Sequence, residues 1–167
     1  MTLGRMIDRA EAERVVRCAP GIQQGVQGDN LGYGNLYYAL ARWLRPRRVL
    51  VIGSGNGFTP FLMPEAPEHN GPGELIFVDP SMSALRDGHN AAHGGEGNWD
   101  TPRQVEERFA CAGVERIQHF RLTNREFFSR PDVGMFDLAV IDGAHDYENV
   151  LFDLNQVVRH LRIPGWI

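Results

Sequence analysis

The chain has 167 residues, of which 43% are hydrophobic, and this length and composition are typical of one globular domain with a buried core. Its formal net charge of −4 and the lack of a Lys/Arg block argue against nucleic acid as a partner. No apolar run reaches the roughly 18 residues of a transmembrane helix and no leader pattern opens the chain, so we expect a cytoplasmic protein without membrane contact.

Two helices are predicted before the first strand. Residues 7–18 are rich in Ala, Glu and Arg with a weak apolar stripe, which indicates a peripheral helix. After a Gly- and Asn-rich loop, apolar residues recur at helical spacing, and we expect this helix to turn its aromatic side chains into the core: Leu36, Tyr37, Leu40, Trp43 and Leu44. Residues 1–30 are therefore assigned to an N-terminal helix and loop, and residues 31–167 to the main domain.

A glycine loop between two strands is the most informative motif. Residues 48–57, Arg-Val-Leu-Val-Ile-Gly-Ser-Gly-Asn-Gly, join a buried strand to the loop, and residues 74–79 form a second strand that ends in Asp79. Glycine lets the backbone turn sharply and approach a ligand, and an acid at this strand end can accept hydrogen bonds from both ribose hydroxyls. The predicted cofactor residues are Gly53, Ser54, Gly55, Asn56, Gly57 and Asp79.

The spacing of the glycines distinguishes two cofactors. A dinucleotide fingerprint requires glycine at position 58, where this chain has Phe58, so NAD is disfavoured. The Gly-x-Gly-x-Gly loop with Asp79 resembles that of class I S-adenosylmethionine-dependent methyltransferases. The resemblance implies an α/β, Rossmann-like, doubly wound and mainly parallel sheet, a loop around the methionine end of S-adenosylmethionine, and Asp79 on the ribose. Val51 departs from the family, which usually has an acid there that helps to hold the methionine amino group.

Proline and glycine shape the segments that follow these two strands. Thr59-Pro60 fits an N-cap followed by a proline in the first turn of a helix. The prolines after it predict that this helix is short or kinked, because proline inside a helix costs roughly 3 kcal/mol. The glycine-rich residues 87–100 predict a mobile flap near the pocket. Thr101-Pro102-Arg103-Gln104 is a capping box that begins the next helix, and Gly113 ends that helix.

Neither the histidines of this flap nor the cysteines form a predicted metal site. His89 and His93 are four residues apart, but without a helix this spacing does not place both rings on one face. Cys18 and Cys111 match no metal or redox spacing, so we expect reduced intracellular thiols.

The third and fourth strands also end in polar residues. Residues 117–122 lead to Thr123 and Asn124, which the resemblance places near the adenine; the alternative is that Asn124 caps the following helix. Residues 136–141 lead to Asp142. Because open α/β sheets bind ligands at the carboxyl ends of their strands, we expect Asp79, Thr123 and Asp142 to converge on one crevice.

A helix with a clear apolar stripe follows the loop Asp142-Gly143-Ala144-His145. We expect this stripe to face the core: Tyr147, Val150, Leu151, Leu154, Val157, Val158 and Leu161. The stretch Ile-Asp-Gly-x-His-x-Tyr resembles, more narrowly, the small-molecule O-methyltransferases grouped with cephalosporin hydroxylase and macrocin O-methyltransferase. Amino-methylating nucleic-acid enzymes carry an Asn/Asp-Pro-Pro-aromatic loop here instead, which further disfavours DNA or RNA as substrate.

The narrower resemblance implies roles for two residues of this loop. Asp142 would contact the cofactor and bind a divalent cation such as Mg²⁺, which prefers carboxylate oxygens. His145 would be the general base that takes the proton of the acceptor hydroxyl, since histidine changes charge near neutral pH. The alternative is that Asp142 and His145 cap the following helix.

Residues 161–167 have the form of the turn that opens the fifth strand in the family, whose full strand order is 3-2-1-4-5-7-6. We therefore expect a sheet that lacks its last strands, with residues 136–141 as an exposed edge that promotes homo-oligomers. We also expect negligible turnover from residues 1–167, because relatives complete the metal site with acids after the fifth strand.

The predicted function is S-adenosylmethionine-dependent methyl transfer to a hydroxyl of a small molecule, with His145 and Asp142 as catalytic residues. Two alternatives remain open. One is a non-catalytic or degenerate relative, or a fragment, that only holds the cofactor. The other is a nicotinamide-dependent oxidoreductase, which Phe58 disfavours.

Overall fold

The computed structural model describes residues 8–19, 27, 30–63, 73–81, 97–114 and 116–167. Five strands form one sheet in the order β3-β2-β1-β4-β5, and all neighbouring strands are parallel. The strands are β1 (Arg48–Ile52), β2 (Glu74–Val78), β3 (Ile117–Phe120), β4 (Phe136–Ile141) and β5 (Leu161–Trp166). The α/β class and the parallel, Rossmann-like sheet predicted from the sequence are confirmed.

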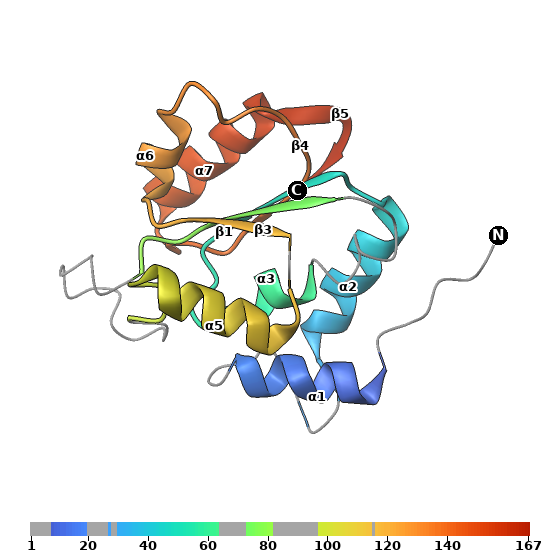
Figure 1. Ribbon diagram of the computed structural model, residues 1–167. Coiled ribbons are helices and arrows are strands. Elements are labelled where there is room, and N and C mark those ends of the chain that lie inside the picture. Colours follow the sequence, from blue (N-terminus) through green and yellow to red (C-terminus); the bar gives the residue numbers. More distant parts are fainter. Residues whose placement is uncertain (1–7, 20–26, 28–29, 64–72, 82–96, 115) are drawn as a thin grey trace.

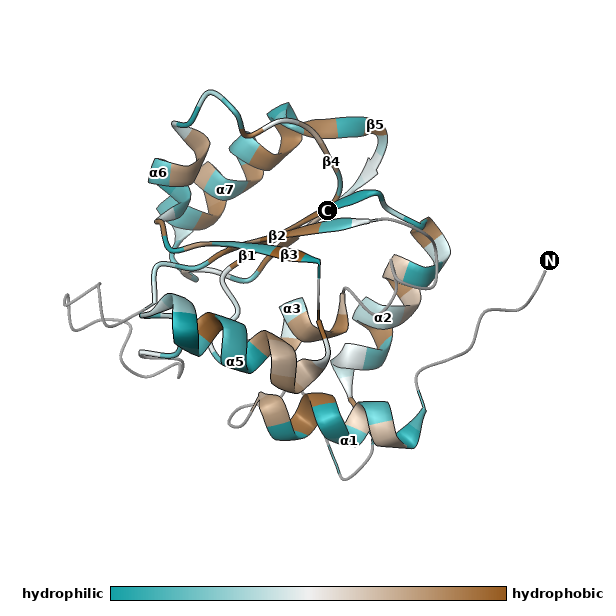
Figure 2. Cartoon of the chain, viewed as in Figure 1, coloured by the Kyte–Doolittle hydropathy of each residue, from teal (hydrophilic) through white to brown (hydrophobic). Residues whose placement is uncertain are grey.

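Helices cover both faces of this sheet (Figure 1). One face carries α1 (Arg9–Cys18), α2 (Tyr33–Leu44), α3 (Phe58–Leu62) and α5 (Pro102–Ala112), and the other carries α6 (Asn124–Phe128) and α7 (Tyr147–Arg159). Successive strand residues point to opposite faces, so Val49 and Val51 join one buried cluster while Leu50 and Ile52 join the other. Figure 2 shows the hydrophobic colour concentrated in the strands between these layers. No described helix has the length and apolar character needed to cross a membrane.

The predicted boundaries of α5 agree with the structure, whereas the helix after the glycine loop begins earlier than predicted. The Thr101 side chain accepts the Gln104 N–H and the Gln104 side chain accepts the Thr101 N–H, while Gly113 ends α5 at φ +76°. The helix after the glycine loop is short, as predicted, but its N-cap is Gly57 rather than Thr59. Thr59 has a side chain suited to an N-cap and Pro60 suits the first helical position, whereas the left-handed Gly57 begins the helix two residues earlier.

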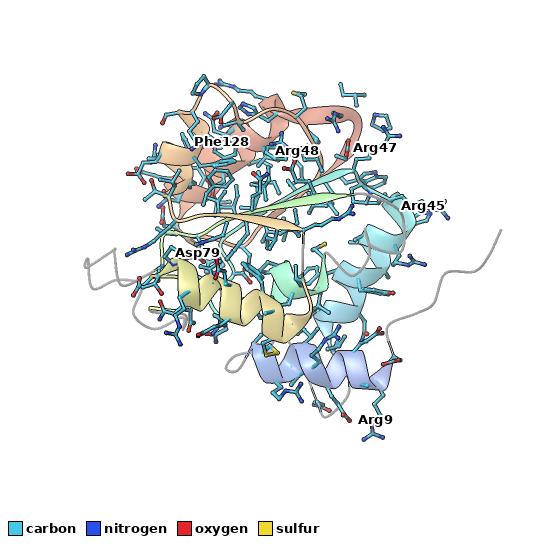
Figure 3. All side chains as sticks on the ribbon, in the orientation of Figure 1. Arg9, Arg45, Arg47, Arg48, Asp79 and Phe128 are labelled. Atoms are coloured by element: carbon cyan, nitrogen blue, oxygen red, sulfur yellow. A yellow bond between two sulfur atoms is a disulfide. The ribbon has the colours of Figure 1, made fainter. Side chains whose placement is uncertain are left out.

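The prediction of reduced cysteines is wrong in this structure. Cys18 and Cys111 form a disulfide between α1 and α5 across 93 positions of sequence (Figure 3). The sequence separation hid the pairing, because only the packing of α1 on α5 brings the two residues together. Disulfides persist mainly in oxidising compartments.

Reduction of this disulfide should lower the free energy of unfolding by about 2–4 kcal/mol, because a cross-link that closes a long loop restricts the unfolded chain. Denaturant unfolding with and without a dithiol measures the difference. The Cys18→Ser/Cys111→Ser double variant should show the reduced stability and should not respond to the dithiol. Equal stability of the oxidised and reduced chains would contradict the prediction.

Two amphipathic helices do not pack as their apolar stripes predict. In α2 the buried residues are Gly34, Tyr38 and Ala41. Of the predicted stripe, Tyr37 and Leu44 pack half-buried against the core, whereas Trp43 is 70% exposed. In α7 only Val157 of the predicted stripe is buried, beside Asp153, and five residues of the stripe are exposed: Tyr147, Val150, Leu151, Leu154 and Val158. Figure 2 shows hydrophobic colour along α7. Periodicity identified the helix correctly, but it did not decide which side meets the sheet.

The expected exposed edge at β4 is also wrong. β4 lies between β1 and β5, and β5 pairs with it in parallel, with an irregular register between Phe136 and Leu138. The two outer strands are therefore β3 and β5. The short segment after α7 forms a strand because Leu161 pairs with Phe136 and Trp166 pairs with Leu138.

Candidate cofactor site

Three backbone hydrogen bonds align the carboxyl ends of the strands. The Gly53 N–H donates to the Val78 carbonyl at 2.8 Å, the Asp142 N–H to the Ile52 carbonyl at 2.8 Å, and the Asp79 N–H to the Phe120 carbonyl at 3.1 Å. Each bond joins the residue after one strand to the last residue of its neighbour. The carboxyl ends of β3, β2, β1 and β4 therefore lie side by side, with the glycine loop between Asp79 and Asp142. The convergence of Thr123 with these two residues stays a prediction.

Two positions of this loop require glycine. Gly53 has φ +68°, and a Cβ added to it would lie 2.5 Å from the Asp142 carbonyl oxygen. Gly57 has φ +90°, and its Cβ would lie 2.8 Å from Cη2 of Trp99. Both values of φ are unfavourable for residues with a side chain, and both approaches are too close for a real Cβ. The loop is therefore held against the β4–α7 loop on one side and against Trp99 on the other.

Hydrogen bonds join residues of the glycine loop to one another and to Asp79. The Gly57 N–H donates to the Ser54 carbonyl at 3.0 Å, the Thr59 N–H to Ser54 Oγ at 3.3 Å, and the Ser54 N–H to Asp79 Oδ2 at 3.3 Å. Among the residues that the structure describes, it shows no acceptor for the N–H groups of Gly55 and Asn56. Consecutive free N–H groups in a glycine turn are suited to bind an anionic group.

Asp79 is buried at the end of β2, with 5% of its surface exposed. Its Oδ1 accepts the Ser81 N–H at 2.8 Å, and its carbonyl oxygen lies 3.2 Å from His119 Nε2. Burial raises the pKa of Asp79 to about 6, although the hydrogen bonds from Ser81 and Ser54 oppose the rise. A buried carboxylate with two backbone donors still has acceptor capacity for hydroxyl groups of a ligand.

This pKa predicts a pH dependence of S-adenosylhomocysteine binding, if Asp79 accepts the ribose hydroxyls. Only the ionised carboxylate can accept both, so the affinity should be constant above pH 7 and fall up to tenfold per unit below a pH of about 6. Calorimetric titration between pH 5 and 8 measures this. The Asp79→Asn variant should bind weakly with no such pH dependence, and a flat wild-type profile would contradict the prediction.

The prediction of a mobile flap over residues 87–100 is wrong for its last part, residues 97–100. Residues 87–96, which include His89 and His93, lie outside the described residues. Trp99 is 1% exposed and lies beneath the glycine loop. Its indole packs against Phe61, Phe77 and Phe109 with ring centroids 4.9–6.2 Å apart. Sequence analysis missed this role, although a tryptophan in an otherwise small and polar segment was a usable signal.

Thr123 and Asn124 follow β3 and are engaged by local contacts. Thr123 is the N-cap of α6, and its side chain accepts the Glu126 N–H at 3.2 Å. The alternative that Asn124 caps this helix is therefore wrong by one residue. The Asn124 side chain donates to Asp153 Oδ1 in α7. Asp153 is fully buried, its Oδ2 has no partner among the described residues, and burial raises the pKa of its carboxyl. Adenine recognition by Thr123 and Asn124 stays a prediction.

The loop between β4 and α7 shows whether Asp142 or His145 caps the following helix. The N-cap of α7 is Asp146, whose Oδ1 accepts the Asn149 N–H at 3.0 Å and whose Oδ2 accepts the Asn149 side-chain amide at 2.7 Å. The alternative that Asp142 or His145 caps α7 is therefore wrong. Asp142 is half-buried beside Gly53, and His145 is exposed.

A concave region lies at the opposite end of the strands. A groove of about 580 Å³ contains four arginines and two acids in its lining: Arg45, Arg47, Arg48, Arg162, Glu74 and Asp137. Asp137 accepts the Arg47 and Arg48 N–H groups and an Arg162 N–H, each at 2.8 Å, and these partners lower its pKa against the effect of its burial. Figure 3 shows Arg45, Arg47 and Arg48 far from Asp79, so this groove is not part of the cofactor site.

Known proteins resemble this chain in sequence and in fold. Residues 50–167 match the sequence profile of a family described as "Methyltransferase domain". No curated protein shows significant similarity to the chain.

Solved structures with the same fold include three methyltransferases. The O-methyltransferase TomG from Streptomyces achromogenes, involved in tomaymycin synthesis and solved with SAM, has TM-score 0.60 and 18% identity over 96% of this chain and 64% of its own. The SAH-bound methyltransferase PaMTH1 from Podospora anserina has TM-score 0.62 and 17% identity over 98% of this chain and 62% of its own. The O-methyltransferase from Bacillus cereus, solved with SAH, has TM-score 0.62 and 13% identity over 94% of this chain and 64% of its own. The chain thus spans less than two thirds of each of these proteins.

Proposed function

Because this chain belongs to the methyltransferase domain family, we propose that it binds S-adenosylmethionine and transfers the methyl group to a hydroxyl of a small molecule. The observation that carries the proposal is the junction of the glycine loop with Asp79. Ser54 donates to the Asp79 carboxylate, and the same loop presents the free N–H groups of Gly55 and Asn56. These groups suit the two polar ends of the cofactor, its ribose and its amino-acid carboxylate.

Different residues at the carboxyl ends of the strands bind the cofactor and carry out the chemistry. Gly55 and Asn56 bind the carboxylate through N–H donors, Asp79 accepts the ribose hydroxyls, and Thr123 and Asn124 lie at the end of β3, where the adenine would rest. S-adenosylmethionine, when bound, supplies a methyl group on a positively charged sulfur. His145 would accept the proton of the acceptor hydroxyl while the hydroxyl oxygen forms its bond to the methyl carbon and the bond from that carbon to sulfur breaks, which leaves S-adenosylhomocysteine. Asp142, half-buried beside Gly53, orients the acceptor.

The described residues offer no cage of protein ligands for Mg²⁺. They contain no group of three or more His, Cys, Asp or Glu side chains that could hold a metal ion. Mg²⁺ is usually held by one or two carboxylates together with waters and substrate oxygens, so its binding by Asp142 stays a prediction. The proton transfer proposed for His145 does not itself require a metal.

Calorimetric titration with S-adenosylhomocysteine and, separately, with NADH tests the proposal. We expect binding of the first and none of the second, because Phe58 stands where a dinucleotide fingerprint has glycine. Binding of NADH alone would favour an oxidoreductase. Transfer of labelled methyl groups to small hydroxylated acceptors then distinguishes an enzyme from a protein that only holds the cofactor. A cytoplasmic location stays a prediction, and so does the exclusion of nucleic acid.

Self-association is expected of residues 1–167, through the exposed apolar face of α7 and the outer strand β5. Leu151 and Val158 of α7 are 43% and 58% exposed, and Ile163 of β5 is 98% exposed. Exposed strand edges and apolar patches favour association. Light scattering should show oligomers that Leu151→Glu/Val158→Glu disperses, whereas the control Leu36→Glu on α2 should not. A monomeric wild-type chain would contradict the prediction.

A further inference from the structure

The underside of the glycine loop is held by side chains that do not belong to the loop. The Trp99 indole N–H donates to the Gly55 carbonyl at 2.9 Å. The Arg108 guanidinium donates to the Asn56 carbonyl, and it lies over the Trp99 ring at 4.6 Å from the centroid. Asn98 donates to the Asn56 side chain at 2.8 Å. Two consecutive carbonyl groups of the loop are therefore bound from one side.

This arrangement decides where the N–H groups of the loop point. A trans peptide unit is planar, so the C=O of one residue and the N–H of the next point in opposite directions. Trp99 holds the Gly55 carbonyl, which turns the Asn56 N–H away from the protein interior. The Ser54 carbonyl accepts the Gly57 N–H, which turns the Gly55 N–H away in the same manner. The N–H groups with no described acceptor are these two.

We propose that Trp99 and Arg108 are positioning residues for the cofactor, which hold the loop so that the N–H groups of Gly55 and Asn56 meet the carboxylate of its amino-acid part. The inference rests on the proposed function. The clamp, formed by Trp99 and Arg108, acts on the amino-acid end of the ligand. Asp79, which serves the ribose, has its own donors in Ser54 and Ser81. Loss of the clamp should thus weaken recognition of the amino acid and leave recognition of the nucleoside intact.

Two ligands that differ only in this part measure the effect. S-adenosylhomocysteine carries the amino-acid group, and 5′-methylthioadenosine has the same thioether nucleoside without it. Trp99→Phe keeps an aromatic ring but removes the N–H donor to Gly55. We expect it to weaken S-adenosylhomocysteine binding about three- to tenfold, the effect of one hydrogen bond, and to change methylthioadenosine binding less than about twofold. Arg108→Gln, which removes the guanidinium donor to Asn56 and tests the clamp if Trp99→Phe does not fold, should show the same selective loss.

Phe109→Leu is the matched control. Phe109 is buried and stacks on Trp99 with ring centroids 5.5 Å apart, but it donates nothing to the loop. This variant should lower the melting temperature and leave the affinity ratio of the two ligands unchanged. The inference would be overturned if Trp99→Phe and Arg108→Gln lost affinity equally for both ligands, or if neither variant lost affinity for S-adenosylhomocysteine. If wild-type protein binds methylthioadenosine and S-adenosylhomocysteine with no preference, the clamp has no role; if it binds neither, the proposed function itself fails.

Discussion

Replacement of His145 by alanine should lower the rate of methyl transfer by about 10²–10⁴, the usual contribution of a general base. The measurement is single-turnover methyl transfer in a form of the protein that is active, whether residues 1–167 alone or a longer product. Because Asp146 caps α7, His145→Ala should leave the melting temperature nearly unchanged. His145 is exposed, so its removal leaves no buried cavity.

Asp146→Ala provides the complementary result. The Asp146 carboxylate binds both the N–H and the side-chain amide of Asn149, and loss of a helix cap costs about 1 kcal/mol of stability. This variant should therefore be less stable and keep most of its rate. If His145→Ala instead loses stability and keeps its rate, His145 has a structural role and the assignment as a general base is wrong.

Asp79→Ala should weaken S-adenosylhomocysteine binding at least about tenfold, since one hydrogen bond to a charged acceptor contributes about 1.5–3 kcal/mol. The carboxylate has two effects on the site. It offers acceptors to the ribose hydroxyls, and it binds the N–H groups of Ser54 and Ser81, which joins the glycine loop to the end of β2. Calorimetry measures the affinity, and thermal unfolding shows whether the variant is folded.

A matched control for Asp79→Ala is Asp132→Ala. Asp132 is an exposed carboxylate that pairs with Arg130 in the loop before β4, away from the carboxyl ends of the strands. Its removal should leave the affinity unchanged. A folded Asp79→Ala protein with wild-type affinity would show that the ribose is held elsewhere and would refute the assignment of the crevice.

Local sequence patterns predicted the parts of the protein that depend on near neighbours. The strand Arg48–Ile52, the glycine loop after it and Asp79 at the end of β2 were predictable because buried parallel strands are continuous apolar runs and tight turns need glycine. The capping box at Thr101 and the αL glycine at position 113 were predictable for the same reason, since each involves residues within one or two turns.

The tertiary structure alone decided which distant residues meet. The disulfide between Cys18 and Cys111 exists because α1 packs on α5, and no spacing rule relates residues so far apart in sequence. Trp99 supports the glycine loop from a segment that composition predicted to be mobile. The apolar stripe of α7 identified a helix but not its buried side. Hydrophobic periodicity shows that a helix is amphipathic, whereas the order of the strands decides which element covers each face of the helix. Sequence therefore determined which residues stand at the strand ends, and packing determined the contacts that hold them in place.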